Sequence, residues 1–256
     1  MAAVARDLSA ELELALDPCA FARAVGITPD APQSMVLRST APRLLLNCTR
    51  QFGKSTVAAI LGAHRALYQP NRLVLCVSPT DRQSAELFDK IAHFVRKAPN
   101  APKRVEDNKR SMRLANGSRV VSLPGSPDTI RGYSGPHLVI VDEAAFCEDA
   151  LFGAVGPMLV VSRGDLVMLS TPYGKRGQFY EVWENGGEDF VRLSVPALEC
   201  SRIDPAVLER EKRTMPDWLF RQEYGCEFVE TLDAVFTHAQ VTGALCEGET
   251  LFGGSS

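Results

Sequence analysis

Residues 44–56, LLLNCTRQFGKST, join an apolar run to a polar loop that contains a glycine–lysine pair. The three leucines predict a buried strand, and an amphipathic pattern predicts a helix over residues 54–68. A glycine and a lysine between a strand and a helix are typical of a phosphate-binding loop, because the N–H groups at the helix start and the lysine ammonium attract phosphate oxygens. The segment therefore predicts an α/β fold that binds a nucleotide.

Three residues of this loop have defined chemical roles in such a site. Gly53 lets the backbone approach the phosphate oxygens, Lys54 reaches the terminal phosphates, and the Ser55 hydroxyl ligates Mg²⁺. The first glycine of the general pattern G-x-x-x-x-G-K-[ST] is Cys48 here, so that pattern fails at its first position. A chance Gly-Lys-Ser at a helix start is the alternative, and the strand before the loop is evidence against it.

Short apolar runs alternate with longer amphipathic runs over residues 43–172, which is typical of β–α–β units on a parallel sheet. An Asn-Gly pair at 116–117, between two short runs, predicts an antiparallel hairpin. Asp81 is the predicted N-cap of the second helix. The predicted strands are 44–47, 73–77, 138–141, 166–170 and 190–195, and the predicted helices are 54–68, 81–95, 176–185, 205–213 and 216–224.

The composition excludes several classes of protein. The net charge is 28 − 31 = −3 over 256 residues, so any contact with nucleic acid must use a local basic patch. No stretch approaches the roughly 20 uncharged apolar residues that cross a bilayer. The seven cysteines are scattered and include no C-x-x-C pair, which indicates a reduced, intracellular protein.

An acidic motif follows the third predicted strand. Residues 136–143, PHLVIVDE, place Asp142 and Glu143 at the carboxyl end of that strand, where open α/β sheets bind their ligands. We expect Asp142 to hold Mg²⁺ through water and Glu143 to polarise the attacking water. Alone, an Asp-Glu pair is more typical of an exposed helix start, but the two motifs in this order favour the catalytic interpretation. Ser170 and Thr171, at the end of the next strand, are expected to touch the γ-phosphate region.

These motifs predict an α/β P-loop NTPase of the ASCE or RecA-like type. We expect a mainly parallel central sheet flanked by helices, with an antiparallel hairpin insertion. The motifs that characterise the chain further are TRQFGKST (49–56), IRG (130–132), VIVDEAAF (139–146), STPYG (170–174), GQFY (177–180) and EYGCEF (223–228).

Together these motifs resemble the N-terminal ATPase part of the large terminase subunit of tailed bacteriophages, over about residues 33–236. Large terminase subunits often lack the first glycine of the loop and carry an arginine within it, as Arg50 does here. The resemblance implies a Mg²⁺-dependent, ATP-hydrolysing motor that moves double-stranded DNA into a procapsid. It also implies a homo-oligomeric ring, a pentamer, on the capsid portal in the host cytoplasm, with the small terminase subunit as a partner and no membrane.

Two other classes of function remain open. A helicase-like translocase would need a second RecA-like lobe, and the residues beyond 195 do not supply the strand–helix series for one. A module that binds nucleotide without hydrolysing it would be expected to lose Lys54 or Glu143, and both are present.

The resemblance also assigns roles to individual residues. Gln33 is the candidate for adenine recognition, with a solvated loop residue as the alternative. Arg131, in a glycine-flanked loop, is the candidate arginine finger for a neighbouring subunit, and Arg50 is the competing candidate in cis. An ordinary surface residue is the alternative for Arg131. The predicted catalytic set is Glu143, Lys54, Arg131 and Arg50; the nucleotide-binding set is Gln33, Arg50, Gln51, Gly53, Lys54, Ser55, Thr56, Ser170 and Thr171; the metal ligands are Ser55 and Asp142.

We expect three parts in the chain: a helical extension over residues 1–32, the ATPase domain over 33–231, and a linker or tail over 232–256. The nuclease domain of large terminase subunits is expected to be absent, because neither Glu247 nor Glu249 belongs to an acidic metal cluster. Residues 96–113 hold seven basic and two acidic side chains and are the candidate DNA-gripping surface. A solvated charged loop is the alternative for this segment.

Overall fold

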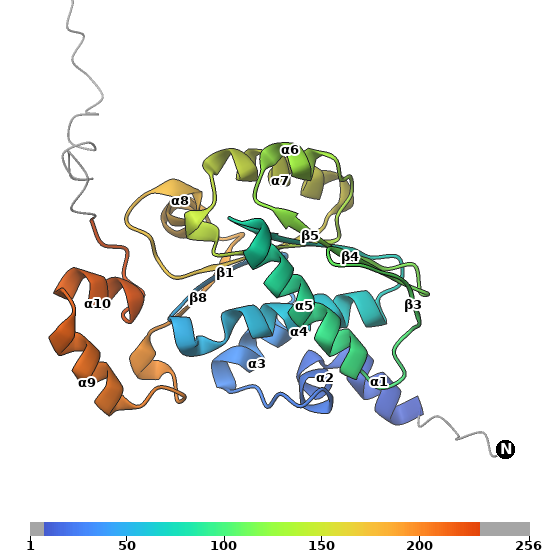
Figure 1. Ribbon diagram of the computed structural model, residues 1–256, viewed down its shortest axis with the longest axis horizontal. Coiled ribbons are helices and arrows are strands. Elements are labelled where there is room, and N and C mark those ends of the chain that lie inside the picture. The colour runs from blue at the N-terminus through green and yellow to red at the C-terminus, as the bar shows by residue number, and fades with distance from the viewer. Residues whose placement is uncertain (1–7, 231–256) are drawn as a thin grey trace, which may run out of the picture.

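Within residues 8–230, which are those that the computed structural model describes, eight strands form one sheet with helices on both faces (Figure 1). The strands are β1 (Arg43–Cys48), β2 (Leu73–Ser78), β3 (Arg104–Asp107), β4 (Ser111–Leu114), β5 (Arg119–Pro124), β6 (Leu138–Asp142), β7 (Asp165–Ser170) and β8 (Val191–Val195). The α-helices are α1 (Leu8–Leu16), α2 (Pro18–Ala24), α3 (Ala31–Arg38), α4 (Lys54–Tyr68), α5 (Asp81–Lys97), α6 (Pro127–Arg131), α7 (Asp149–Ser162), α8 (Gly177–Asn185), α9 (Pro205–Thr214) and α10 (Asp217–Glu223).

The sheet has the order β3-β4-β5-β2-β6-β7-β1-β8. The six strands from β5 to β8 in this order are parallel, and β3 and β4 add to one edge as an antiparallel pair. The predicted parallel sheet with a hairpin insertion is therefore confirmed. Every predicted strand and helix is present, and no end differs by more than two residues from its predicted position.

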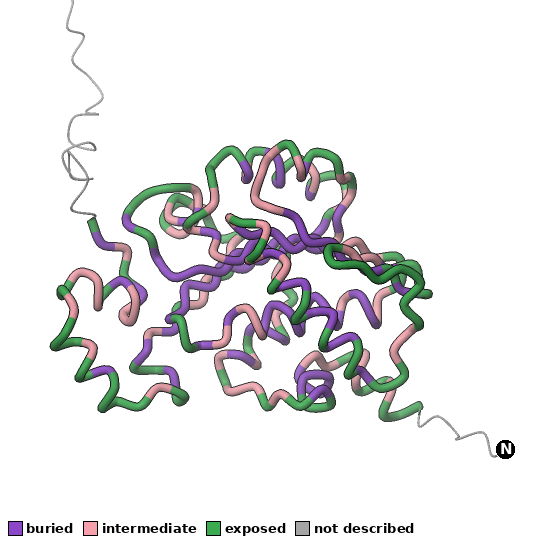
Figure 2. The backbone as a smooth tube through the Cα atoms, viewed as in Figure 1, coloured by how far each residue is buried: buried purple, intermediate pink, exposed green. Residues whose placement is uncertain are grey.

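Alternate residues of the strands pack into two apolar layers. Leu44 and Leu46 of β1 face the layer that α2 to α5 complete, whereas Leu45 faces the layer completed by α6, α7 and α8. Figure 2 shows buried stretches that run along the sheet and along α4. Burial on both faces explains why β1 is a continuous leucine run, since neither set of side chains meets water. α9 and α10 lie at the β8 end of the sheet.

The first three helices pack against α4. Phe21 of α2 and Leu37 of α3 belong to the same buried cluster as Ile60 of α4. The predicted domain boundary at residue 33 falls within α3, and the division into domains stays a prediction. The predicted tail over residues 232–256, including Glu247 and Glu249, lies outside the described residues. Within the described part of the chain, no helix combines the length and the apolar character needed to cross a membrane.

The N-cap of α5 differs from the prediction. Thr80, and not Asp81, caps the helix, because the Thr80 hydroxyl accepts a hydrogen bond from the backbone N–H of Gln83 at 3.3 Å. Asp81 is the first helical residue and forms an ion pair with Arg110 of the hairpin. Threonine and aspartate both cap helices well, so the sequence alone could not decide between neighbouring positions.

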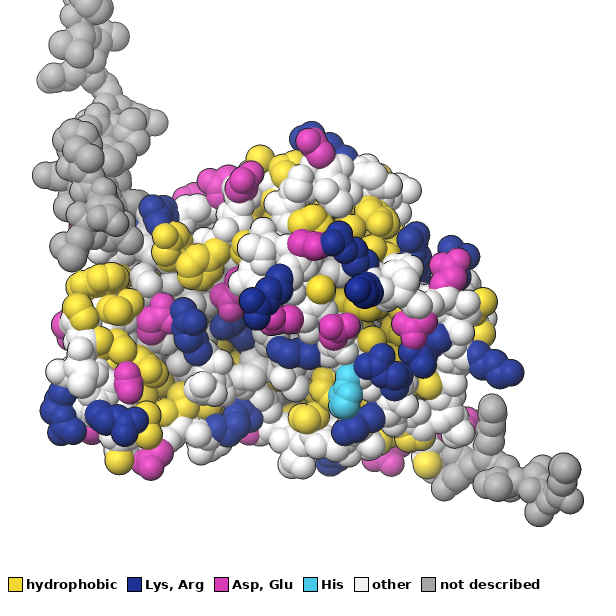
Figure 3. Space-filling view, in the orientation of Figure 1, with side chains coloured by type: hydrophobic (Ala, Val, Ile, Leu, Met, Phe, Trp, Pro, Cys, Tyr) yellow, Lys and Arg dark blue, Asp and Glu magenta, His cyan; other side chains and the backbone are white. Residues whose placement is uncertain are grey.

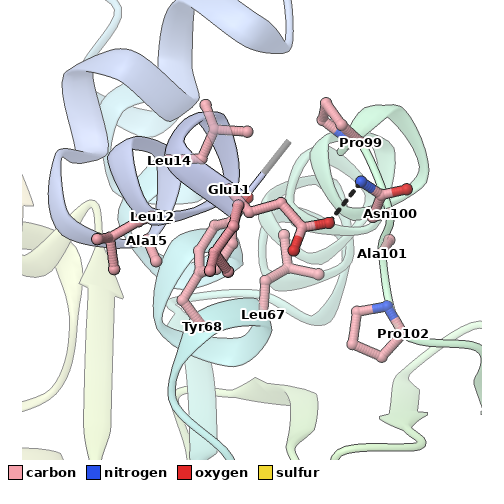
Figure 4. A pocket seen from close by; sticks show the side chains of 11 residues that line it. Glu11, Leu12, Leu14, Ala15, Leu67, Tyr68, Pro99, Asn100, Ala101 and Pro102 are labelled. Carbon is pink, nitrogen blue, oxygen red and sulfur yellow. Dashed lines mark hydrogen bonds between the residues drawn. The ribbon is translucent and has the colours of Figure 1, made fainter. Parts of the chain in front are cut away.

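A groove of about 310 Å³ lies beside the last turn of α4 (Figure 4). Leu12 and Ala15 of α1 lie on one side of Tyr68, and the segment that follows α5 forms the other side. Glu11 of α1 accepts a hydrogen bond from Asn100 of that segment at 2.8 Å. Because Lys54 starts α4, this groove lies at the end of the helix remote from the phosphate-binding loop.

The turn between β4 and β5 provides a test of the hairpin. Gly117 has φ of +85°, and a Cβ atom there would lie 2.0 Å from Oδ1 of Asn71. Gly117→Ala should therefore lower the free energy of unfolding by at least about 1 kcal/mol. Gly153→Ala is the matched control: Gly153 lies within α7, and a Cβ atom there would meet nothing within 4 Å, so this variant should gain about 0.5 to 1 kcal/mol. Denaturant unfolding of both variants measures the difference, and equal effects would contradict this turn geometry.

Candidate nucleotide-binding site

The loop after β1 is shaped around Gly53. The short helix η1 (Arg50–Phe52) precedes Gly53, which adopts a left-handed backbone with φ of +81° before α4 begins at Lys54. A Cβ atom at this position would be strained and would lie 3.3 Å from Nε2 of Gln33. No side chain caps the first turn of α4, whose N–H groups are the donors that a phosphate group takes. The local geometry thus fits the predicted role of Gly53.

Lys54 is buried against Glu143. The lysine is 5% exposed, and its ammonium Nζ lies 3.3 Å from Oε1 of Glu143. A buried ammonium needs an anion beside it, and Glu143 provides one here. Glu143 also has φ of +54°, a strained value for a residue other than glycine, and such strain is concentrated at functional sites. The structure brings together the residue predicted to bind the terminal phosphates and the residue predicted to activate water.

Asp142 lies beside the first turn of α4. Its carboxylate accepts a hydrogen bond from Ser55, and it also accepts the backbone N–H of Glu143 at 3.0 Å. Burial raises the pKa of Asp142, and the negative charge of Glu143 raises it further. The Ser55 hydrogen bond and the charge of Lys54 act in the opposite direction without cancelling the effect. The two predicted metal ligands, Ser55 and Asp142, are therefore in contact.

A hydroxyl beside a carboxylate suits Mg²⁺, which prefers oxygen ligands and retains several waters. Across residues 8–230, no three His, Cys, Asp or Glu side chains gather into a metal-binding cluster. The predicted binding of Mg²⁺ by Ser55 and Asp142, with phosphate oxygens and water as further ligands, stays a prediction. When bound there, Mg²⁺ supplies positive charge to the phosphates.

Ser170 and Thr171 are buried at the same edge of the sheet. β7 pairs with β6 so that Leu169 lies opposite Asp142, which puts the end of β7 next to the acidic motif. The Ser170 hydroxyl accepts the backbone N–H of Ala145 at 3.2 Å. Ser170 therefore ties the end of β7 to the segment after Glu143, and the predicted contact of both residues with the γ-phosphate stays a prediction.

Gln33 is a structural partner of the phosphate-binding loop. Its side chain is 4% exposed, and Nε2 donates to the carbonyl of Phe52 at 2.9 Å. Its Oε1 accepts the backbone N–H of Asp30 at 3.3 Å, which completes a capping box at the start of α3. Arg202, which the sequence did not single out, donates to Phe52 at 2.7 Å and to Asp30 at 2.8 Å. The amide of Gln33 thus holds the loop, and its adenine contact stays a prediction.

The two candidate arginines lie on the surface. Arg50 forms an ion pair of 2.5 Å with Glu223, at the end of α10. Arg131 is the last residue of α6 and does not lie in a loop as predicted; among the described residues it forms an ion pair with Asp128, one turn earlier, at 3.4 Å. Its side chain is 65% exposed. The structure does not bring Arg131 to Lys54 within one chain, so its predicted role would require a neighbouring subunit.

Two further loop residues contribute backbone contacts. The carbonyl of Gln51 accepts the thiol of Cys200 at 3.9 Å, and the N–H of Thr56 donates to the carbonyl of Gly53 at 2.9 Å. Their predicted side-chain contacts with nucleotide remain predictions.

The end of α10 and the segment that follows it support the site in a way that sequence reasoning missed. Asn47 is buried in β1 and its Nδ2 donates to the carbonyl of Cys226 at 2.8 Å. The Thr49 hydroxyl donates to the carbonyl of Glu223 at 3.2 Å. In the sequence, Asn47 alone could have indicated these contacts, because a buried amide that follows three leucines needs a polar partner.

The basic segment 96–113 is partly neutralised. Ion pairs join Arg104 to Asp107, Arg110 to Asp81 and Arg113 to Glu106, the last at 3.9 Å. Figure 3 shows basic and acidic side chains mixed over the hairpin side of this face. Its role as a DNA-gripping surface stays a prediction.

Comparison with protein families matches residues 45–242 to the family described as "Terminase large subunit, T4likevirus-type, N-terminal". The chain belongs to this family. It is the N-terminal, ATPase part of a terminase large subunit, as the sequence motifs predicted.

Relatives of this terminase domain come from several phages. It is 27% identical to the large terminase subunit of Thermus phage G20c, over 85% of this chain and 52% of the relative. Its identity to the corresponding protein of Escherichia phage T5 is 29%, over 79% of this chain and 48% of that one. The chain thus spans about half the length of the curated relatives it matches.

Solved structures show the same fold. The large terminase ATPase domain of Thermus phage P74-26 matches with a TM-score of 0.70 and 25% identity, over 82% of this chain and 97% of that one. The large terminase of another thermophilic bacteriophage, solved in a complex with ADP, matches with a TM-score of 0.65 and 11% identity, over 78% of this chain and 54% of that chain. At that identity the second likeness shows the fold alone.

The raised pKa of Asp142 leads to a stability test. An aspartate whose pKa is raised on folding destabilises the folded state while it is ionised, and this cost disappears as the pH falls towards the ordinary value of about 4. Asp142→Asn should therefore raise the free energy of unfolding by on the order of 1 kcal/mol near neutral pH without Mg²⁺ or nucleotide. The gain should shrink at acidic pH.

Denaturant unfolding at about pH 7.5 and about pH 4.5 checks this expectation. Asp89→Asn, on the exposed face of α5, is the control with the same chemical change and should have little effect at either pH. A loss of stability in Asp142→Asn at neutral pH would show that the carboxylate stabilises the fold.

Proposed function

We propose that this chain is the ATP-hydrolysing motor domain of a viral DNA-packaging machine, and that it depends on Mg²⁺. The observation that carries the proposal is the pair of contacts at one edge of the sheet: Lys54 with Glu143, and Ser55 with Asp142. A cation for phosphates, two oxygen ligands and a carboxylate for water are the parts that phosphoryl transfer to water requires. Family membership and the likeness to the ATPase domain of the Thermus phage P74-26 terminase support ATP as the substrate.

The ion pair between Lys54 and Glu143 suggests an order of events. The terminal phosphates of ATP compete with Glu143 for the buried ammonium, because phosphate is the more highly charged anion. Glu143 then loses its partner and can accept a proton from the attacking water. Substrate binding would thereby release the base for the reaction, and Glu143 would be held by Lys54 when no nucleotide is present.

The proposed cellular role follows from the family. The domain would couple hydrolysis to the movement of double-stranded DNA into a procapsid, as part of a pentameric ring on the portal in the host cytoplasm. The small terminase subunit would be a further partner. The exposed position of Arg131 supports its action on a neighbouring site in such a ring, because a finger that acts in trans must reach beyond its own chain.

Two substitutions should separate binding from hydrolysis. Lys54→Ala removes the buried cation, so ATP binding and turnover should both be lost. Glu143→Gln keeps the shape of the side chain but removes the base, so ATP should still bind while turnover falls by about 10²-fold or more. Calorimetric ATP titration and phosphate release measure the two effects. Lys97→Ala, in the last turn of α5, is a control for the loss of one lysine and should match the parent chain.

Tight ATP binding by Lys54→Ala would contradict the assignment of the loop. Unchanged turnover in Glu143→Gln would show that another carboxylate activates the water.

The role of Arg131 in trans can be tested by mixing. Arg131→Ala should bind ATP normally and lose turnover by about 10³-fold or more. Adding Glu143→Gln should restore activity, because a site with its own Glu143 then receives Arg131 from the other chain. Specific activity of the parent chain should also rise with protein concentration. If mixing the two variants restored no activity, and turnover of the parent chain did not depend on its concentration, Arg131 would not act in trans. Arg50 would then be the candidate that stabilises the transition state.

A further inference from the structure

A polar cavity of about 160 Å³, separate from the groove beside Tyr68, lies at the amino edge of the sheet. It is formed where β2, β6 and β7 begin and where α4 ends, so it lies at the opposite end of α4 from Lys54. The helix has 15 residues and separates the two places by about 20 Å. The polar side chains that line the cavity are Arg65, Gln69, Arg72, His137, Ser162, Arg163 and Asp165.

The charges around this cavity are unbalanced. Three guanidinium groups line it with one carboxylate, and that carboxylate is already engaged: Nη2 of Arg65 lies 3.0 Å from Oδ2 of Asp165. Among the described residues no carboxylate oxygen lies within 4 Å of the guanidinium of Arg72 or Arg163, although the charge of Arg72 also acts on Asp165. Arg43, whose Nη1 donates to the carbonyl of Gly164 at 2.7 Å, adds positive charge beside the cavity.

Arg72 supplies an independent sign that an acceptor is needed. Its Nε atom is buried and, like Nε of Arg119, has no hydrogen-bond partner in the described part of the chain. Buried donors are almost always paired, because water is no longer available to them. The carbonyl groups at the end of α4 attract cations and account for Arg65 in the last turn. These carbonyl groups do not provide a partner for Nε of Arg72, which therefore still lacks a hydrogen-bond acceptor.

His137 adds a further donor. Its Nδ1 accepts the backbone N–H of Leu73 at 3.2 Å, so the ring proton is on Nε2. Burial and the charge of Arg72 lower the pKa of His137, which keeps the ring neutral near pH 7. The imidazole therefore lines the cavity without adding another charge.

We propose that this cavity binds one phosphate group. Guanidinium groups match the oxygens of a tetrahedral oxyanion in charge and geometry, and their fixed forks favour phosphate over a simple halide. The volume suits a single phosphate group with water and is too small for the base and sugar of a nucleotide. The phosphate belongs either to free inorganic phosphate or to the backbone of a DNA strand that passes the amino edge of the sheet.

Inorganic phosphate is the probe for the site, and the full 256-residue chain carrying Lys54→Ala is the starting protein, so that the phosphate-binding loop does not contribute. Calorimetric titration at constant ionic strength should give saturable binding. Adding Arg72→Met should weaken it about 10- to 100-fold, the effect of losing one charged hydrogen-bond partner. Arg82→Met, on an exposed arginine paired with Glu86, is the matched control and should leave the affinity unchanged.

Arg163→Gln gives a second reading, because Arg163 is exposed and its replacement should not affect folding. It should weaken phosphate binding in the same direction. Equal affinity in the Arg72, Arg163 and Arg82 variants, or no saturable binding in the starting protein, would overturn the proposal. Because every chain in the series lacks Lys54, this outcome does not depend on whether the domain hydrolyses ATP.

A DNA-binding experiment distinguishes free phosphate from the phosphate of a DNA backbone as the occupant of the cavity. If the occupant is a DNA backbone, Arg163→Gln should weaken binding of a short duplex relative to Arg82→Met, and inorganic phosphate should compete with the duplex. If the occupant is free phosphate, duplex binding should be the same in both variants while phosphate binding still differs. Either result supports a phosphate site.

Discussion

The arrangement of the site depends on one buried cation. The Lys54 ammonium is held away from water at the start of α4, and such a charge requires an anion within reach. Glu143 supplies it from the end of β6, which β7 separates from β1, and adopts a strained left-handed backbone in that position. The same ammonium suits phosphate, so one charge links the resting structure to substrate binding. On entering the site, ATP would therefore replace Glu143 with its terminal phosphates as the partner of Lys54.

The surrounding fold keeps this cation in place. Parallel strands bring the ends of β1, β6 and β7 to one edge, so that the loop, the acidic motif and Ser170 meet there. Contacts from far along the chain then brace the loop: Gln33 and Arg202 both donate to the carbonyl of Phe52. Segments separated by about 150 residues thus converge on a few backbone atoms of a single loop.

Sequence reasoning succeeded where local pattern determines structure. The leucine run of β1 and the glycine before Lys54 specify a strand, a loop and a helix within a few residues, and these were found. Local pattern could not find α7, because Gly153, Gly156 and Pro157 disfavour a helix that tertiary packing nevertheless stabilises. It also missed β3, whose four residues are all exposed and lack alternation. The ion pair of Arg50 with Glu223 spans 173 residues and leaves no local pattern.

A structure of this chain with Mg²⁺ and a non-hydrolysable ATP analogue tests the account most directly. The quantity to measure is the position of the Lys54 ammonium, which lies 3.3 Å from Glu143 in the present structure. We predict that it moves to the β- and γ-phosphate oxygens, that Ser55 and Asp142 lie at the metal ion, and that Glu143 faces a water beside the γ-phosphate. A nucleotide bound elsewhere, with the pair between Lys54 and Glu143 intact, would contradict the account.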